Sequence, residues 1–269
     1  MKKLVVTADD FGASLEINEA VERAHREGVL TAASLMVGEP AAADAVERAR
    51  RMPRLGIGLH VALTNARPVL PAARVPDLVD GRGLFDSRLV RAGVRYFASS
   101  RARAQLRDEI AAQFDAFAAT GLPLDHVDAH NHMHVHPTLF SMILESGKAH
   151  GMKAMRVPFE PFHLSAAGIG NAIAIGPWAS LMRARLRGAG VLANDAVFGL
   201  NDTGRLDEER VLEIVARLPE GVSELYLHPA TSHAGYARAE EFDALLSSRV
   251  RDAIARRGIA LVTFGALAA

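Results

Sequence analysis

Short apolar runs alternate with amphipathic stretches along most of the chain. The first run, Leu4–Ala8, is continuous, which is typical of a strand that is buried on both faces. A helix is expected from Ser14, which can cap its first turn, to about His25, and Gly28 ends it. The same patterns predict further strands at Thr31–Val37, Leu55–Leu63, Leu124–Val135, Met152–Val157, Glu224–His228 and Ile259–Phe264. They predict further helices after Pro40, at Arg101–Thr120, from Pro137, near Trp178–Leu186, at Asp207–Leu218 and at Glu240–Arg257.

Strands that alternate with helices predict an α/β fold with a parallel sheet. At 269 residues, a distorted (β/α) barrel, with parallel strands surrounded by helices, is favoured over an open sheet. Residues 64–100 are expected to form a long loop with a short helix. We expect a single domain, residues 1–269, with an apolar loop and helix insertion at about 158–206.

Composition excludes several kinds of site. Lys plus Arg equals Asp plus Glu, 31 each, so the net charge is zero and no nucleic-acid partner is indicated. The absence of cysteine excludes disulfides, thiolate metal sites and a cysteine nucleophile. Gly56 and Gly58 form a GxG that lacks the third glycine of a dinucleotide site. No secretory signal pattern is found, and a cytoplasmic location is expected.

Ionisable side chains lie late in five of the predicted strands or directly after them. These residues are Asp9, Asp10, His60, Asp128, His130, Arg156 and His228. In β/α barrels the catalytic groups lie at the C-terminal ends of the strands, so these side chains are expected on one rim. A turn, a helix cap or surface polarity explains any one of them alone. Their repetition at five strand ends favours a functional site.

Four alternating histidines extend this pattern in the segment DAHNHMHVHP. If the segment stays extended, His130, His132, His134 and His136 point to one face together with Asp128. At a rise of ~3.3 Å per residue the first and last lie roughly 20 Å apart, so one metal ion cannot hold all four. Each histidine could instead belong to a polar rim or be a hydrogen-bonded histidine of the core.

The adjacent acids Asp9 and Asp10 point in different directions on an extended strand. This suits a division of labour, with one carboxylate on a metal ion and the other on a water. One Asp with two His leaves a coordination position open, which is typical of a catalytic divalent ion such as Zn²⁺. Carboxylate and imidazole ligands also admit Mg²⁺.

Four motifs occur together and in one order: VTADDFG, then GLH at Gly58–His60, DAHNHMH at Asp128–His134 and LHP at Leu227–Pro229. In these motifs the chain resembles the YdjC-like carbohydrate deacetylases over almost its whole length. TAASLMVG and AAADAVERAR further resemble the branch associated with hopanoid lipid biosynthesis. The resemblance implies a NodB-like distorted barrel that removes N-acetyl groups from amino sugars.

The resemblance also implies roles for the residues at the strand ends. It implies one divalent ion held by Asp10, His60 and His130, Asp9 as the general base, His228 as a catalytic histidine, and Arg156 as the group that orients the base. His132, His134 and Asp128 are expected around the substrate, where the two histidines would bind sugar hydroxyls. Asp128 could also orient His60 or His130 through the second ring nitrogen.

The hopanoid branch implies an N-acetylglucosaminyl hopanoid glycolipid as substrate. Pro161–Met182 is uncharged, although its glycines make it a poor transmembrane helix. Among its large apolar side chains are Ile169, Ile173, Ile175, Trp178, Leu181 and Met182. They could line an apolar channel or contact the inner face of the membrane, or they could be buried in the core or in a homodimer interface.

Three alternatives to a glycolipid deacetylase remain open. The first is a chitooligosaccharide deacetylase. The second is another metal-dependent hydrolase, which predicts two metal ions bridged by an acid. The third is a non-catalytic barrel that binds a sugar or a lipid.

Overall fold

The computed structural model describes residues 1–161, 166–232 and 239–268, with their side chains except those of residues 166–174. A seven-stranded parallel sheet has the order β4-β3-β2-β1-β6-β5, and β7 pairs with the first half of β1. The strands are β1 (Lys2–Phe11), β2 (Ala32–Leu35), β3 (Gly56–Val61), β4 (Val127–Ala129), β5 (Ala196–Phe198), β6 (Gly221–Leu227) and β7 (Ala260–Leu261).

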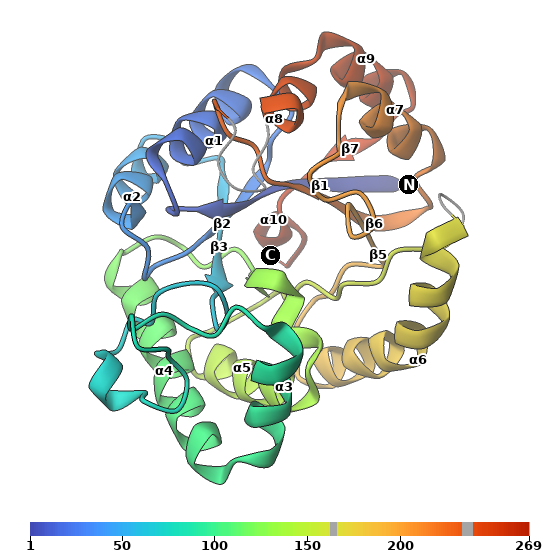
Figure 1. Cartoon of the computed structure of the whole chain (residues 1–269). Helices are drawn as coiled ribbons and strands as arrows, with labels where there is room; N and C mark the ends of the chain where they lie inside the picture. The colour runs from blue at the N-terminus through green and yellow to red at the C-terminus, as the bar shows by residue number, and fades with distance from the viewer. Residues whose placement is uncertain (162–165, 233–238, 269) are drawn as a thin grey trace.

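Helices surround this sheet, as Figure 1 shows. They are α1 (Leu15–Glu27), α2 (Ala42–Arg50), α3 (Leu89–Ala98), α4 (Ser100–Ala119), α5 (Pro137–Ala149), α6 (Ala166–Gly188), α7 (Glu208–Arg217), α8 (Ala239–Leu246), α9 (Ser248–Arg256) and α10 (Phe264–Ala268). Two 3₁₀ helices are η1 (Ala72–Arg74) and η2 (His130–Val135). The predicted parallel α/β architecture with surrounding helices is confirmed. Among the described helices, none has the length and hydropathy needed to cross a membrane.

An extended segment joins the two edge strands of the sheet, β4 and β5. Met155 forms a single parallel bridge with Val127 of β4, and Ala154 forms one with Leu192, shortly before β5. The predicted strand Met152–Val157 is therefore reduced to isolated bridges. These bridges give the curved sheet its distorted-barrel character.

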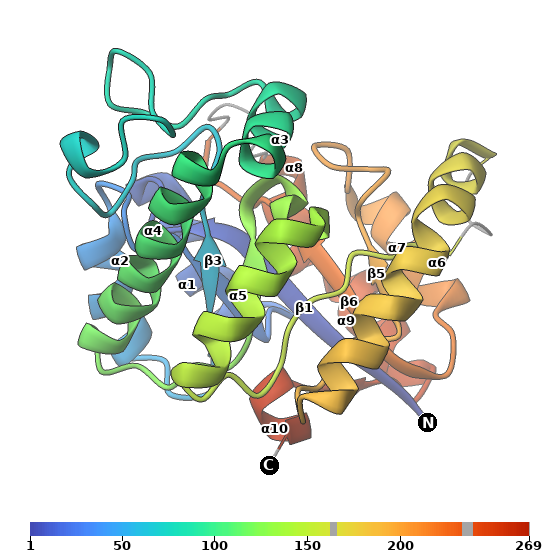
Figure 2. The same cartoon turned by 90° about the horizontal axis from the view of Figure 1, so that it is seen from below.

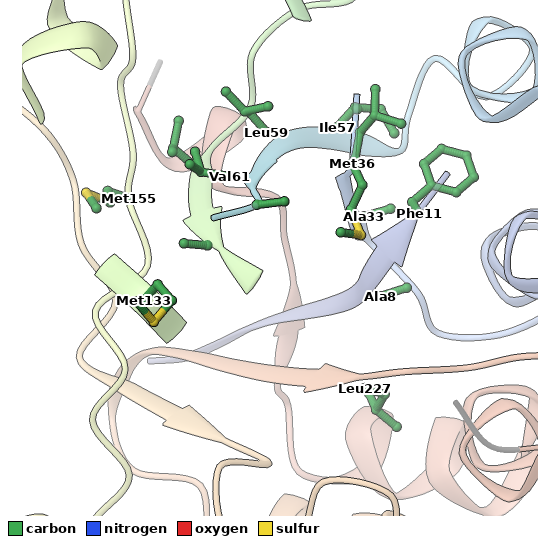
Figure 3. Packing of buried hydrophobic residues seen from close by; sticks show 14 of the residues in the cluster. Ala8, Phe11, Ala33, Met36, Ile57, Leu59, Val61, Met133, Met155 and Leu227 are labelled. Carbon is green, nitrogen blue, oxygen red and sulfur yellow. The ribbon is translucent and has the colours of Figure 1, made fainter. Parts of the chain in front are cut away.

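The pleat of β1 separates an apolar shell from a polar interior. Leu4 and Val6 point outward and belong to the main hydrophobic core under the helices. Figure 3 shows other members of this shell, among them Leu59 and Leu227. Thr7 alternates with these residues, points inward and donates a hydrogen bond to Glu224. The barrel interior can therefore carry charged groups while the outer face of the strands supplies the hydrophobic core.

A small apolar cluster closes the N-terminal end of the barrel. Phe264, the first residue of α10, is fully buried against Val5, Ala32 and Ala154. We call these four residues the barrel floor. Figure 2 shows α10 and both chain ends on this side, with α3 and the loop before it on the opposite side. The strand predicted at Ile259–Phe264 is shorter than expected, because Phe264 begins the helix that forms the floor.

The predicted strand Leu124–Val135 ends early, at Ala129. The next six residues form η2, within which Asn131 and His132 have a left-handed backbone with φ of 52°. The expectation that four histidines alternate on one face is therefore wrong. His136 instead lies at the N-cap position of α5.

The segment 158–206 contains β5 and the helix that precedes it. It contributes β5 to the sheet, where β5 pairs with β6. Its helix, predicted near Trp178–Leu186, is the 23-residue α6. The single helix predicted at Glu240–Arg257 is two helices, because Ser247 caps a new helix by accepting a hydrogen bond from the Val250 amide.

Removing the aromatic ring of the barrel floor should destabilise the fold. We expect Phe264→Ala to lower the free energy of unfolding by about 3–5 kcal/mol, because it leaves a cavity among buried groups. Leu261→Ala, at a β7 position that is 39% exposed, is the control and should cost much less. Urea unfolding of both variants measures the difference, and equal losses would contradict the role given to Phe264.

Candidate metal centre and catalytic cavity

A β-bulge at the end of β1 brings two adjacent acids into one site. The register between β1 and β2 shifts between Ala8 and Phe11, so β1 has one extra residue there. Asp10 has a φ of 63°, a left-handed conformation that Asp adopts more readily than most residues. The bulge and this conformation turn the Asp10 carboxylate to the same site that Asp9 faces from the regular strand.

Buried hydrogen bonds hold the loop that follows the bulge. The Gly12 amide donates to the Asn18 side-chain carbonyl at 2.8 Å, and the Asn18 amide nitrogen donates to the Ala41 carbonyl at 3.0 Å. Asn18 is fully buried in α1. The left-handed backbone of Asp10 costs about 1–3 kcal/mol, and these contacts help to fix the loop in spite of that cost.

Asp10, His60 and His130 form a buried donor set that fits a divalent metal ion. The Asp10 Oδ1 atom lies 3.3 Å from His60 Nε2 and 2.9 Å from His130 Nδ1. The three candidate ligand atoms lie within 4.8 Å of one another. Tetrahedral zinc with bonds of about 2.0–2.2 Å separates its ligand atoms by roughly 3.3 Å, so this spacing fits the ion.

Asp128 orients the imidazole of His60. The Asp128 Oδ1 atom lies 2.8 Å from His60 Nδ1, so this nitrogen donates and Nε2 faces Asp10. Burial alone would lower the pKa of His60, but the charges of Asp128 and Asp9 and hydrogen bonds to Asp10 and Asp128 raise it well above its usual value. A metal ion must therefore displace a proton from His60 when it binds.

The buried guanidinium of Arg156 connects three carboxylates. It donates to both oxygens of Asp9, at 2.7 and 2.8 Å, and to both oxygens of Glu224, at 3.0 and 2.8 Å. It also lies 2.7 Å from Asp128 Oδ2, and it packs 4.9 Å from the centre of the Tyr226 ring. Burial opposes the charge of Arg156, but the three carboxylates hold its pKa well above its usual value.

The acids of this buried cluster outnumber its permanent cation. Four buried carboxylates, those of Asp9, Asp10, Asp128 and Glu224, stand against the one guanidinium of Arg156, which gives a formal charge of −3 before any histidine is protonated. Burial alone would raise the pKa of Asp10, yet His130 and His60 hold it well below its usual range. This excess of negative charge is what a divalent cation would offset.

A cavity of about 320 Å³ opens beside these groups, within the ~300–1,000 Å³ range of small-molecule sites. It is lined by Asp9, His60, His130, Asn131, His132, Leu200, Thr203, Tyr226 and His228. The backbone amide of His228 donates to Glu241 at 2.6 Å, which fixes the position of the chain after β6. The cavity therefore holds the Asp9 carboxylate, two candidate metal ligands and two further histidines, His132 and His228.

The three residues predicted around the substrate have different surroundings. His132 lines the cavity and lies 3.0 Å from the Tyr226 hydroxyl, and burial holds its pKa well below the usual value. His134 is fully buried, which lowers its pKa to about 3. Asp128 is also fully buried, against His60 and Arg156. Neither His134 nor Asp128 lines the cavity.

Sequence reasoning missed Glu224, Tyr226 and Thr203. Tyr226 places its hydroxyl 3.0 Å from Thr203 Oγ1, and both residues line the cavity. Glu224, Tyr226 and His228 lie at alternate positions, so they share the inward side of β6. The period of two was visible in the predicted strand Glu224–His228 and could have identified the first two residues.

The fold and the site define a class: a parallel α/β barrel with a candidate carboxylate–imidazole metal site at the C-terminal ends of its strands. The chain belongs to the YdjC-like protein family, whose sequence model matches residues 3–256. The predicted family resemblance is confirmed.

Individual relatives cover nearly the whole chain. The carbohydrate deacetylase of Brevibacillus brevis is 32% identical over 98% of this chain and 99% of its own length. The carbohydrate deacetylase of Geobacillus stearothermophilus is 30% identical, with 97% and 96% covered. The crystal structure of a proposed cellobiose-phosphate cleavage protein from Enterococcus faecalis V583 has a TM-score of 0.79 and 27% identity, with 100% of this chain and 99% of that chain covered.

Loss of the carboxylate that orients His60 should weaken metal binding. We expect Asp128→Asn to lower the affinity for Zn²⁺ by about 10- to 100-fold, because the imidazole loses the partner that fixes its ring. Competition with a chromogenic chelator measures this affinity. Asp115→Asn, which changes a carboxylate that is 74% exposed, is the matched control. Equal Zn²⁺ affinity in both variants would show that Asp128 does not orient His60 for metal binding.

Proposed function

We propose that the protein is a metal-dependent deacetylase that hydrolyses the N-acetyl group of an amino sugar. The observation that carries the proposal is the division of the two adjacent acids. Asp10 lies with His60 and His130, whereas Asp9 is held apart by Arg156 and lines the cavity. Relatives named carbohydrate deacetylases, matched over almost their full length, support the substrate class.

Asp9 is proposed as the general base. The two parallel hydrogen bonds from Arg156 fix the plane of its carboxylate, and each oxygen keeps a second lone pair for another donor. Asp9 can therefore take a proton from a water that attacks the acetyl carbonyl carbon. A divalent ion held by Asp10, His60 and His130 would polarise the carbonyl and lower the pKa of that water.

His228 is proposed as the acid that completes the reaction. An amine leaves poorly without a proton, and His228 lines the cavity at the end of β6. The hydroxyls of Tyr226 and Thr203 and the imidazole of His132 lie in the same cavity and can bind sugar hydroxyls. Zn²⁺ is the favoured ion because two ligands are imidazoles, and Mg²⁺, which prefers oxygen ligands, is the second candidate.

Replacing the base should stop the reaction without removing the ion. We expect Asp9→Asn to reduce kcat on chitooligosaccharides by about 10²- to 10⁴-fold, while the metal content stays near one ion per chain. Mass spectrometry of the sugars reports the loss of acetyl groups, and elemental analysis reports the ion. Full activity with bound ion would rule out Asp9 as the base. Wild-type protein that binds these sugars but releases no acetate would support the non-catalytic alternative.

Within this activity we propose a glycolipid substrate, an N-acetylglucosaminyl sugar on a hopanoid body. The support is an apolar groove of about 540 Å³ between α3 and η2, which we call the α3 groove. Its lining residues are Leu89, Val90, Gly93, Val94, Phe97, Ala98, Asn131, His132, Met133, Val135 and His136. Asn131 and His132 also line the catalytic cavity, so an apolar body joined to a bound sugar can extend into this groove.

The exposed side chains of α3 strengthen this assignment. Val90 is 83% exposed, Val94 63% and Phe97 66%. Apolar surface is stabilised by about 25 cal/mol for each Å² removed from water, so an apolar ligand that covers these side chains gains affinity. The groove lies against α3, in the region that the sequence predicted as a loop with a short helix.

The uncharged stretch Pro161–Met182, which was predicted to contact lipid, contributes less to the proposed lipid site than the α3 groove does. Met182 is fully buried, and the Trp178 indole donates to the Val135 carbonyl at 2.8 Å. Ile175 lines a second hollow of about 210 Å³, and Leu181 is 49% exposed. The side chains of Ile169 and Ile173 lie outside the described residues. The described part of this stretch is therefore largely packed against the protein.

A series of alkyl glycosides tests the α3 groove. For wild-type protein we expect KM to fall as the alkyl chain on N-acetylglucosamine lengthens from methyl to octyl. The double variant Val94→Ser, Phe97→Ser should lose this dependence and keep its activity on the methyl glycoside. Leu181→Ser, at an exposed apolar position on α6, is the control. A KM that is independent of chain length in wild-type protein would favour a chitooligosaccharide substrate.

A further inference from the structure

A line of hydrogen bonds runs through the barrel from its floor to the metal site. The Asp125 Oδ1 atom lies 3.0 Å from His126 Nδ1, and His126 Nε2 lies 3.1 Å from the Ser34 hydroxyl. Ser34 donates to Asp128 Oδ2 at 3.0 Å, and Asp128 Oδ1 accepts from His60 Nδ1 at 2.8 Å. Four contacts thus connect Asp125, beside α10, to a candidate metal ligand.

The donors and acceptors along this line determine the protonation state of His126. Asp128 accepts a hydrogen bond from His60 and forms an ion pair with Arg156, so it is an ionised carboxylate, and the single proton of Ser34 is donated to it. The Ser34 oxygen must then accept from His126 Nε2. The carboxylate of Asp125 likewise accepts from His126 Nδ1. Both ring nitrogens therefore donate, which only an imidazolium can do.

The charges around His126 agree with this count. Burial lowers the pKa of His126. The hydrogen bond and charge of Asp125 oppose this effect, and so do the charges of Asp128 and Glu224, so that the pKa lies above its usual value. These three carboxylates face it from the chain around β4 and from β6. His126 itself is fully buried and packs against Phe264, with 5.2 Å between the ring centres and the rings tilted by 42°. The ring is thus held between anions in a place that water does not reach.

Gly56 and Gly58 of β3 leave the space that the Asp125 and His126 side chains occupy. A Cβ atom on Gly58 would lie 2.5 Å from the His126 ring, and one on Gly56 would lie 2.7 Å from the Asp125 carboxylate. Real Cβ contacts are essentially never this short. The two glycines, which no nucleotide site explains, are needed so that Asp125 and His126 can enter the barrel.

A nucleophilic role for Ser34 does not fit its surroundings. Asp125, His126 and Ser34 have the order and spacing of a Ser-His-Asp triad. However, Ser34 and His126 are fully buried and neither lines the catalytic cavity, so an acyl substrate cannot reach the hydroxyl. The proton of Ser34 is also directed to Asp128 rather than to His126.

We propose that His126 is a buried imidazolium which, through Ser34, fixes Asp128 and thereby the metal-facing nitrogen of His60. The proposal rests on the proposed function only in taking His60 as a metal ligand. Ser34 occupies Asp128 Oδ2 together with Arg156, which leaves Oδ1 to His60. His126 and Ser34 are therefore positioning residues, and the part of the barrel near its floor is coupled to the metal site through them.

Nitrogen NMR tests the protonation of His126 directly in the metal-free protein. With ¹⁵N-labelled histidine, we expect both His126 ring nitrogens to show imidazolium shifts at pH 8, where an unperturbed histidine with a pKa of about 6.5 is neutral. The resonance is assigned as the one missing from His126→Gln. A neutral tautomer at pH 8 would overturn the proposal. This measurement uses the wild-type fold and needs no substrate.

Metal affinity tests the positioning role. We expect Ser34→Ala to weaken Zn²⁺ binding by about three- to tenfold, less than the loss when a direct partner of a ligand is removed. Thr7→Val is the matched control, because Thr7 is an equally buried hydroxyl that donates to Glu224 at 2.7 Å instead of to Asp128. Its Zn²⁺ affinity should stay close to the wild-type value.

Equal Zn²⁺ affinity in Ser34→Ala and wild-type protein would overturn the positioning role. Circular dichroism establishes that each variant is folded before its affinity is compared. If instead the proposed function is wrong, wild-type protein would bind Zn²⁺ without removing acetyl groups from any sugar.

Discussion

The guanidinium of Arg156 is the constraint on which the site depends. Asp9, Asp128 and Glu224 are buried, and buried carboxylates stay ionised only where a cation or hydrogen-bond donors satisfy them. Arg156 does so with its planar fork, which pairs with both oxygens of Asp9 and both of Glu224 and also reaches Asp128. It thus fixes Asp9 at the cavity, and through Asp128 it also supports the orientation of His60.

The bulge in β1 brings two adjacent acids to one site and gives each a different partner. A regular strand would point Asp9 and Asp10 to opposite faces, one into the barrel and one under the helices. The extra residue and the left-handed Asp10 bring both carboxylates to the same site, where one faces a guanidinium and the other faces two imidazoles. The two acids therefore have different partners, and this difference supports one as a base and the other as a ligand.

Much of this arrangement could be predicted from the sequence, because apolar runs mark the strands and polar residues mark their ends. Asp9, Asp10, His60, His130 and His228 all lie at the predicted rim. The turn after β4 could not be predicted, since alternation of histidines looks the same whether or not Asn131 adopts a left-handed backbone. The three-residue β5 was too short to show a pattern. The role of Phe264 depends on a contact with Val5 that is distant in sequence.

In the proposed site, one ion lies among Asp10, His60 and His130, while Asp9 remains paired with Arg156. A second group of potential ligands, formed by Asp9, His60 and Asp128, lies next to the first, and both of its acids contact Arg156. Anomalous diffraction at the zinc edge from zinc-loaded crystals distinguishes the two arrangements. We expect one peak per chain, about 2 Å from the ligand atoms of the first group. A second peak, bridged to the first by Asp9, would contradict this expectation.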